Sequence, residues 1–172
     1  MSVLPILKYP DPMLKRVSQP VTSIQKDIRQ LVDDMFETLH DAMGVGLAAP
    51  QVGQLMRVIV VDLSAHQEGS DLVALINPEI VWSDGEVIWE EGCLSVPELT
   101  VEIPRKEHVK VTGLDFKGKP LELKADGLFA IALQHELDHL NGRLIIDRLS
   151  ALKRELYRKK SRKDKDEVQA EG

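Results

Sequence analysis

The 172-residue sequence has a single cysteine, Cys93, and no run of apolar residues long enough to span a membrane. One cysteine cannot form an intramolecular disulfide, so we expect a reducing compartment, the cytoplasm, and a thiol free for metal binding or catalysis. A membrane-spanning helix needs roughly 20 consecutive apolar residues, and none is present. The start of the chain, MSVLPILKYPDPML, is interrupted by prolines and predicts no export signal.

Acidic and basic residues are unevenly distributed along the chain. The formal net charge is −6, from 22 Lys and Arg against 28 Asp and Glu. Residues 148–165 nevertheless contain nine Lys or Arg and only two acidic residues, so this segment is strongly basic while the remainder is acidic. Such a segment is either a solvated helix end or a binding surface for a polyanion, and charge alone does not distinguish the two.

Hydrophobic spacing predicts one helix, then many short strands. Apolar residues at helical intervals predict a helix over 23–43, begun by a capping box of Thr22 and Gln25. The segment 44–53, GVGLAAPQVG, contains glycine and proline and predicts an irregular loop. Short strands are predicted at 57–62, 72–77, 79–82, 86–89, 98–103, 109–116 and 120–124. Their turns favour antiparallel pairing.

Helical spacing returns in the last third of the chain. A second helix is predicted from Asp126, a good N-cap, to the stop signal Asn141-Gly142, and a third from Ser150. The order predicts an α+β fold of short, mainly antiparallel strands around a central helix, with an N-terminal helix and a basic C-terminal helix. The length suits one domain, 1–172, in which about 150–172 form the basic helix and tail.

The second predicted helix carries the pattern HExxH, from His135 to His139. Residues four apart lie about 40° apart around a helix axis, so both imidazoles can reach one ion. Glu136 is turned by about 100° and lies beside the open coordination position instead of binding the ion. The pattern predicts a divalent-metal hydrolase in which Glu136 handles protons.

A catalytic metal usually has three protein ligands and one open position, so a third ligand is required. Two protease classes supply it in ways that fit poorly here. One class has a histidine as third ligand at the position occupied here by Ile145. The other class uses a downstream glutamate, and the candidate here, Glu155, lies in a predicted basic helix. The remaining soft ligand is Cys93, inside EGCLS (91–95), although a lone cysteine is more commonly a small buried apolar residue.

Three segments resemble the signature motifs of the peptide deformylases: GVGLAAPQ (44–51), EGCLS (91–95) and QHELDH (134–139). They occur in the family's order and at similar separations, and the resemblance spans most of the chain. It implies a metal-dependent hydrolase that removes the N-formyl group from the N-terminal formyl-methionine of new proteins and releases formate. The implied metal ligands are Cys93, His135 and His139.

The resemblance also implies roles for further residues. Glu136 takes a proton from water and delivers it to the departing amine, while the Gln51 side chain and the Leu94 backbone N–H donate to the oxyanion. Arg105 matches a family arginine that pairs with the glutamate of EGCLS, and Thr100 stands where some members have a peptide-contacting arginine. Residues implied to contact substrate are Val45, Gly46, Trp89, Glu91, Leu128, Ile131 and Ala132.

The cofactor, the partners and two alternatives complete the interpretation. Cysteine with two histidines suits several metals, and the resemblance favours Fe²⁺, with Zn²⁺, Ni²⁺ or Co²⁺ as substitutes.

The resemblance also favours formyl-methionyl nascent chains as substrate and the ribosome as the polyanion bound by residues 148–165. No membrane and no sequence-specific nucleic acid is expected as partner. The alternatives are a zinc peptidase that cleaves internal peptide bonds and a metal-stabilised binding module without turnover.

Overall fold

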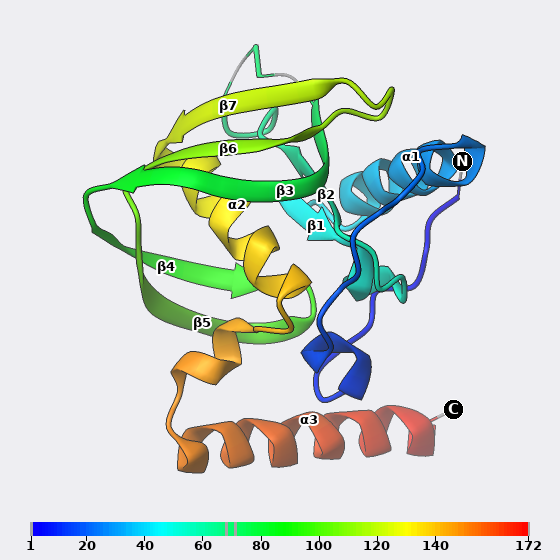
Figure 1. The fold of residues 1–172 in the computed structure, drawn as a ribbon. Helices are drawn as coiled ribbons and strands as arrows, with labels where there is room; N and C mark the ends of the chain where they lie inside the picture. Colours follow the sequence, from blue (N-terminus) through cyan, green and yellow to red (C-terminus); the bar gives the residue numbers. More distant parts are fainter. Residues whose placement is uncertain (1, 68, 71, 172) are drawn as a thin grey trace.

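Helix α2 (Gly127–Leu140) lies between a five-stranded sheet and a two-stranded hairpin in the computed structural model (Figure 1). The structure describes residues 2–67, 69–70 and 72–171. Among these residues, side chains are described up to Arg162. Within these residues, no helix combines the length and the apolar character needed to cross a membrane. The predicted α+β fold with mainly antiparallel strands is confirmed.

The large sheet has the strand order β1-β2-β3-β6-β7, and every neighbouring pair is antiparallel. Its strands are β1 (Gly46–Ala48), β2 (Val58–Asp62), β3 (Leu72–Asp84), β6 (His108–Leu114) and β7 (Pro120–Asp126). The strands β4 (Val87–Cys93) and β5 (Val96–Arg105) form the separate hairpin. The two strands predicted at 72–77 and 79–82 are one strand, whose pairing with β6 is irregular around Pro78, because proline has no N–H for a regular ladder.

Strand β2 is buried along its whole length because both faces of the sheet are covered. Val58 and Val60 pack in the apolar cluster with helix α1 (Lys26–Asp41), while Ile59 and Val61 pack in the cluster with α2. This two-sided burial explains the uninterrupted apolar run of β2, where a sheet with one solvated face would show alternation.

Two local predictions at the start of the chain are wrong. Helix α1 begins at Lys26 with Gln25 as its N-cap, and Gln25 Nε2 donates to Ser23 Oγ at 3.1 Å instead of forming the predicted capping box with Thr22. The segment 44–53 is not wholly irregular, because it contains β1 and a 3-10 turn, η2 (Ala49–Val52). A three-residue strand is fixed by its pairing with β2, which local sequence does not reveal.

The C-terminal helix α3 (Ala151–Glu171) directly follows a short 3-10 turn, η3 (Ile145–Arg148). Another such turn, η1 (Pro12–Lys15), lies near the start of the chain. The predicted start of α3 is confirmed, since Ser150 Oγ accepts a hydrogen bond from Lys153 N at 3.3 Å. Tyr157 fixes α3 to the body of the protein by contacting the ring of Tyr9 and by donating to Pro97 O at 2.7 Å. The side chains at 163–165, part of the predicted basic segment, lie outside those described.

Candidate metal centre

Cys93, His135 and His139 bring three ligand atoms to one point, all within 4.8 Å of one another. The two histidine Nε2 atoms are 3.2 Å apart, and Cys93 Sγ is 3.4 Å from His139 Nε2. Around a tetrahedral ion bound to nitrogen at about 2.0 Å and to sulfur at about 2.3 Å, ligand atoms are separated by roughly 3.3–3.6 Å. The three side chains therefore fit a single metal ion.

Local structure explains why these residues meet. His135 and His139 lie one helical turn apart on the buried helix α2. Cys93 ends β4, where the hairpin pairing with β5 becomes irregular between Glu91 and Cys93. That irregularity occurs at Gly92, and it lets the cysteine leave the strand's regular alternation beside the tight turn to Val96.

The outer nitrogen of His135 faces the carboxylate of Glu91, with Nδ1 2.9 Å from Oε1. Arg105 donates from Nε and Nη2 to the same carboxylate at 2.7 and 2.8 Å, and both side chains of this ion pair are buried. Burial alone would raise the pKa of Glu91, but hydrogen bonds from Arg105 and His135 outweigh burial and hold this pKa below its usual value. An ionised carboxylate on Nδ1 fixes the ring and leaves Nε2 for an ion.

The two histidines differ in their electrostatic surroundings. Burial and the neighbouring His135 lower the pKa of His139, which keeps this imidazole neutral as a metal ligand must be. Burial also lowers the pKa of His135, but Glu136, Cys93 and Glu91 outweigh it and raise the pKa above its usual value. The negative potential that favours a proton on His135 equally favours a divalent cation.

Glu136 is 2% exposed, and its Oε2 has no hydrogen-bond partner among the residues that the structure describes. Its Oε1 lies 3.8 Å from His135 Nε2, beside the ligand cluster. Burial raises the pKa of Glu136 to about 7, and the charge of His135 offsets this only in part. A carboxyl group with a pKa near neutrality can both accept and deliver a proton at physiological pH.

The amide of Gln51 is held in one orientation next to Cys93. Its Oε1 accepts from Ala48 N at 2.9 Å, and its Nε2 donates to Ser95 Oγ at 3.0 Å. The same Nε2 lies 3.8 Å from Cys93 Sγ, which places an N–H donor at the edge of the ligand cluster. Ser95 was not predicted to belong to the site, and its position two residues after Cys93 in EGCLS was the only signal for it.

A cavity of about 380 Å³ opens in front of His135 and Glu136. All residues predicted to contact substrate line it, together with Gln51 and Leu94. These substrate-contact residues are Val45, Gly46, Trp89, Glu91, Leu128, Ile131 and Ala132. Gly44, Glu90 and Gly92 also line the cavity and were not predicted to contact substrate. The ligand His139 is buried and is not among the lining residues.

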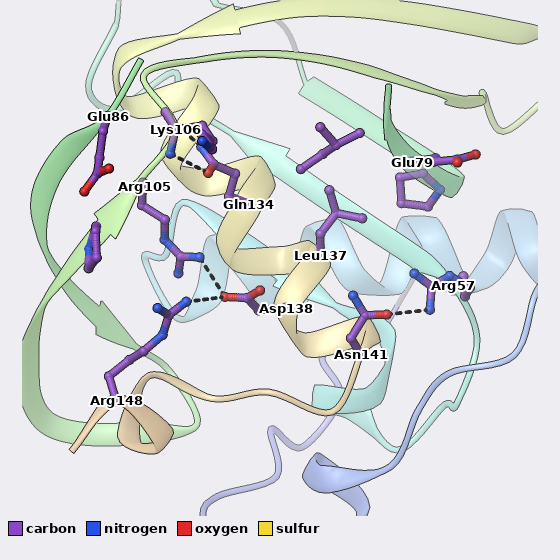
Figure 2. A pocket seen from close by; sticks show the side chains of 13 residues that line it. Arg57, Glu79, Glu86, Arg105, Lys106, Gln134, Leu137, Asp138, Asn141 and Arg148 are labelled. Atoms are coloured by element: carbon purple, nitrogen blue, oxygen red, sulfur yellow. Dashed lines mark hydrogen bonds and ion pairs between the residues drawn. The ribbon is translucent and has the colours of Figure 1, made fainter. Parts of the chain in front are cut away.

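A second cavity, of about 580 Å³, lies against the opposite side of α2 (Figure 2). Gln134, Leu137, Asp138 and Asn141 form its helix wall, and Figure 2 shows ion pairs from Arg105 and Arg148 to Asp138. It is the larger of the two cavities, but none of the three metal ligands lines it.

Residues 3–155 match the family model described as polypeptide deformylase. The chain belongs to the peptide deformylase family. It is 54% identical over 160 residues to the peptide deformylase of Thermodesulfovibrio yellowstonii, covering 93% of this chain and 97% of that protein. It is 48% identical over 170 residues to the peptide deformylase of Syntrophobacter fumaroxidans, covering 99% of this chain and all of that protein.

Solved structures of deformylases share the fold. The crystal structure of a peptide deformylase from Legionella pneumophila superimposes with a TM-score of 0.90 at 44% identity, covering 99% of both chains. That of Ehrlichia chaffeensis in complex with actinonin gives a TM-score of 0.88 at 43% identity, covering 95% of this chain and 98% of that chain.

Family membership settles the activity. The protein is an enzyme that hydrolytically removes the N-formyl group from nascent peptides, as the three sequence motifs predicted. The alternatives of a zinc peptidase and a binding module without turnover are therefore wrong. The family and the cluster of Cys93, His135 and His139 together indicate a single bound metal ion.

Proposed function

We propose that this deformylase works with one ferrous ion held by Cys93, His135 and His139, and that the formyl-methionine end of the substrate enters the 380 Å³ cavity. The observation that carries the proposal is the buried carboxyl group of Glu136 beside three converging ligand atoms. A buried carboxyl oxygen without a hydrogen bond, such as Oε2 of Glu136 among the described residues, destabilises a fold. Its presence next to a ligand cluster therefore supports a catalytic role.

The ligand set is compatible with several ions. A thiolate and two imidazoles suit Fe²⁺, Zn²⁺, Ni²⁺ and Co²⁺, and we choose Fe²⁺ because of the family resemblance. When bound, such an ion supplies a Lewis acid that lowers the pKa of water from 15.7 to roughly 7. With iron, a thiolate ligand makes the enzyme sensitive to peroxide, whereas the zinc form resists oxidation better.

We assign proton transfer to Glu136. Its carboxylate accepts a proton from the attacking water, whose oxygen forms the new bond to the formyl carbon. The C–N bond of the formamide then breaks, formate leaves, and the amine departs with the proton that Glu136 returns. The pKa of about 7 supports this role, because both transfers are then possible near neutral pH.

We assign stabilisation of the developing oxyanion to Gln51 Nε2 and the backbone N–H of Leu94. The support for Gln51 is its fixed amide, anchored through Ala48 N and Ser95 Oγ, because a donor already in place needs no reorganisation during the reaction. Leu94 follows the Cys93 ligand directly, and both residues line the cavity.

We assign the apolar part of the cavity to the methionine side chain. Its walls include Val45, Trp89, Leu128, Ile131 and Ala132, which offer a thioether chain an apolar surface. The backbone at Val45 and Gly46 is proposed to pair with the extended peptide. Glu91 also lines the cavity, but its carboxylate is occupied by Arg105 and His135, so we assign it to positioning His135.

We further propose that residues 1–172 form one domain in the cytoplasm and that the basic segment 148–165 meets the ribosome. The support is the match of the family model to residues 3–155 and the density of cations on α3. A solvated helix end remains the alternative. Removing the residues after Leu152 should reduce salt-sensitive co-sedimentation with ribosomes, and unchanged co-sedimentation would exclude this partner.

The substrate and metal are tested with purified protein loaded separately with Fe²⁺, Ni²⁺ and Zn²⁺. We expect one ion per chain, formate release from a formyl-Met tripeptide, faster turnover with Fe²⁺ than with Zn²⁺, and no cleavage of internal peptide bonds. Equal or faster turnover with Zn²⁺ would contradict the choice of iron. Binding of the ion by a Cys93→Ala variant as tightly as by the wild type would contradict the ligand set.

A further inference from the structure

Asp138 lies inside the HExxH segment, directly before the ligand His139 and three residues after the ligand His135. Its side chain lines the 580 Å³ cavity, where Oδ2 accepts from Arg105 Nη1 at 2.7 Å (Figure 2). Through Nε and Nη2, the same guanidinium binds both oxygens of Glu91. Arg105 therefore joins a carboxylate on helix α2 to a carboxylate on strand β4.

We propose that Asp138 is a positioning residue for the metal site, which with Arg105 and Glu91 holds the β4–β5 hairpin against helix α2. The hairpin carries Cys93, and the helix carries His135 and His139. The inference rests on the ligand set proposed above. It adds that the distance between the two halves of the site depends on a residue that touches neither the ion nor the substrate.

The sheet topology explains why such a clamp is needed. The hairpin is a separate two-stranded sheet and, among the residues that the structure describes, shares no strand pairing with the five-stranded sheet. An isolated two-stranded hairpin is marginally stable, so side-chain contacts must hold it in place. Its apolar residues pack in a cluster with those around η3, and the ion pair of Arg105 with Asp138 adds a link to helix α2 itself. Metal affinity requires ligand atoms to be held to within a few tenths of an ångström.

Burial makes the clamp effective. The side chains of Arg105 and Glu91 are 5% and 4% exposed, and that of Asp138 is 23% exposed, so solvent screens these charges poorly. Three N–H groups of Arg105 are used, two by Glu91 and one by Asp138. Without Asp138, the buried guanidinium keeps only Glu91 as partner and is free to shift, and Glu91 moves with it away from His135 Nδ1.

A neighbouring cation provides a matched control. Arg148 Nη2 lies 3.7 Å from the same Oδ2 of Asp138, beyond hydrogen-bond distance, and the Arg148 side chain is 39% exposed. It contacts Asp138 but is not bonded to Glu91. Replacing Arg148 therefore changes the charge next to Asp138 and leaves the connection from helix to hairpin intact.

The test compares Co²⁺ binding by the full-length wild type, Asp138→Asn and Arg148→Gln. Competition with a chromogenic chelator gives the dissociation constant, and thiolate-to-Co²⁺ absorption reports whether Cys93 is bound. We expect affinity roughly 5- to 10-fold weaker in Asp138→Asn, with a weaker thiolate band, because losing a direct outer partner of a metal ligand costs about 10- to 100-fold and Asp138 acts one step further out, through Arg105 and Glu91. Arg148→Gln should stay within about twofold of the wild type, because the clamp remains complete.

Asp138→Glu keeps the carboxylate and should recover part of the lost affinity, which a merely structural defect would not allow. Wild-type affinity in Asp138→Asn, or an equal loss in Arg148→Gln, would overturn the inference. If Asp138→Asn does not fold, Asp138→Ser, which also lacks the carboxylate, is measured in its place, and a wild-type constant and band in that variant overturn the inference. Failure of the wild type to bind Co²⁺ through a thiolate would instead refute the proposed ligand set.

Discussion

Gly46 lies against the buried carboxyl group of Glu136, and a Cβ at position 46 would be 3.0 Å from Glu136 Cγ and 3.2 Å from Oε2. These contacts are shorter than a side chain normally tolerates. Strand β1 and helix α2 are therefore packed so closely that a Cβ at position 46 would push the carboxyl group aside by a few tenths of an ångström. The absence of a side chain at position 46 fixes the position of the proposed proton carrier.

Gly46→Ala should consequently displace Glu136. We expect kcat to fall by roughly 3- to 10-fold, because a shift of a few tenths of an ångström is smaller than the misplacement of about 1 Å that costs about 100-fold. Metal content should not change, since Glu136 is not a ligand. Formate-release kinetics and metal analysis of the variant check this, and wild-type kcat in a metal-loaded Gly46→Ala would show that the carboxyl group is not so constrained.

Gln51→Ala should remove one of the two proposed oxyanion donors. We expect kcat to fall by roughly 10²- to 10³-fold, as is usual for the loss of such a donor. Ser95→Ala is the matched control, because it keeps the donor and removes one of the two groups that anchor the Gln51 amide, so we expect a smaller loss. Steady-state kinetics that show a larger defect in Ser95→Ala than in Gln51→Ala would contradict the assignment.

Lys8 should contribute to the geometry of the loop that carries Leu94. Its Nζ donates to Leu94 O at 2.7 Å, although the side chain is exposed. One such bond is worth about 1 kcal/mol, so Lys8→Met should lower kcat by about fivefold with little change in KM. Lys8→Arg keeps a donor and should lie closer to the wild type, and equal defects in both variants would argue against a role for this bond.

Asp62 should make the stability of the protein depend on pH in the acid range. Burial alone raises its pKa, but hydrogen bonds from Ser64 and the contact with His40, 2.5 Å away, outweigh burial and lower it. A lowered folded-state pKa means that the contribution is present above the unfolded value of about 3.8 and is lost as pH falls through the folded value. Stability therefore rises with pH across this interval.

Asp62→Asn should remove that contribution. Urea denaturation of the metal-free protein should show a lower free energy of unfolding for the variant at pH 7 and a smaller difference from the wild type near pH 3. A difference that is constant across this range would mean that the Asp62 carboxylate is not preferentially stabilised in the folded state.

Local spacing was enough to predict the centre of the site. His135 and His139 need only a helix to face one ion, because residues four apart lie on the same side of it. Cys93 was predicted because a metal pair lacked a partner and EGCLS resembled a family motif. Leu128 and Ile131 line the cavity, although their apolar character alone would have suggested ordinary residues of the hydrophobic core.

Contacts between distant segments were not predictable from pattern. The bond from Arg105 to Asp138 joins residues 33 apart, and that from Lys8 to Leu94 joins residues 86 apart. The strand β1 exists only through its pairing with β2, and the capping box failed because Gln25 bonds Ser23 instead. Sequence spacing reports neighbours on one helix or strand, whereas these features depend on how separate elements pack.

The most direct test of the proposed mechanism is formate release by Glu136→Gln and wild type, measured at equal, confirmed metal content with a formyl-Met tripeptide. Glu136→Gln should keep the fold and the ion but turn over roughly 10²- to 10⁴-fold more slowly, because the amide cannot carry the proton from water to the departing amine. Turnover within a few-fold of the wild type would contradict the assignment of Glu136 as the proton carrier.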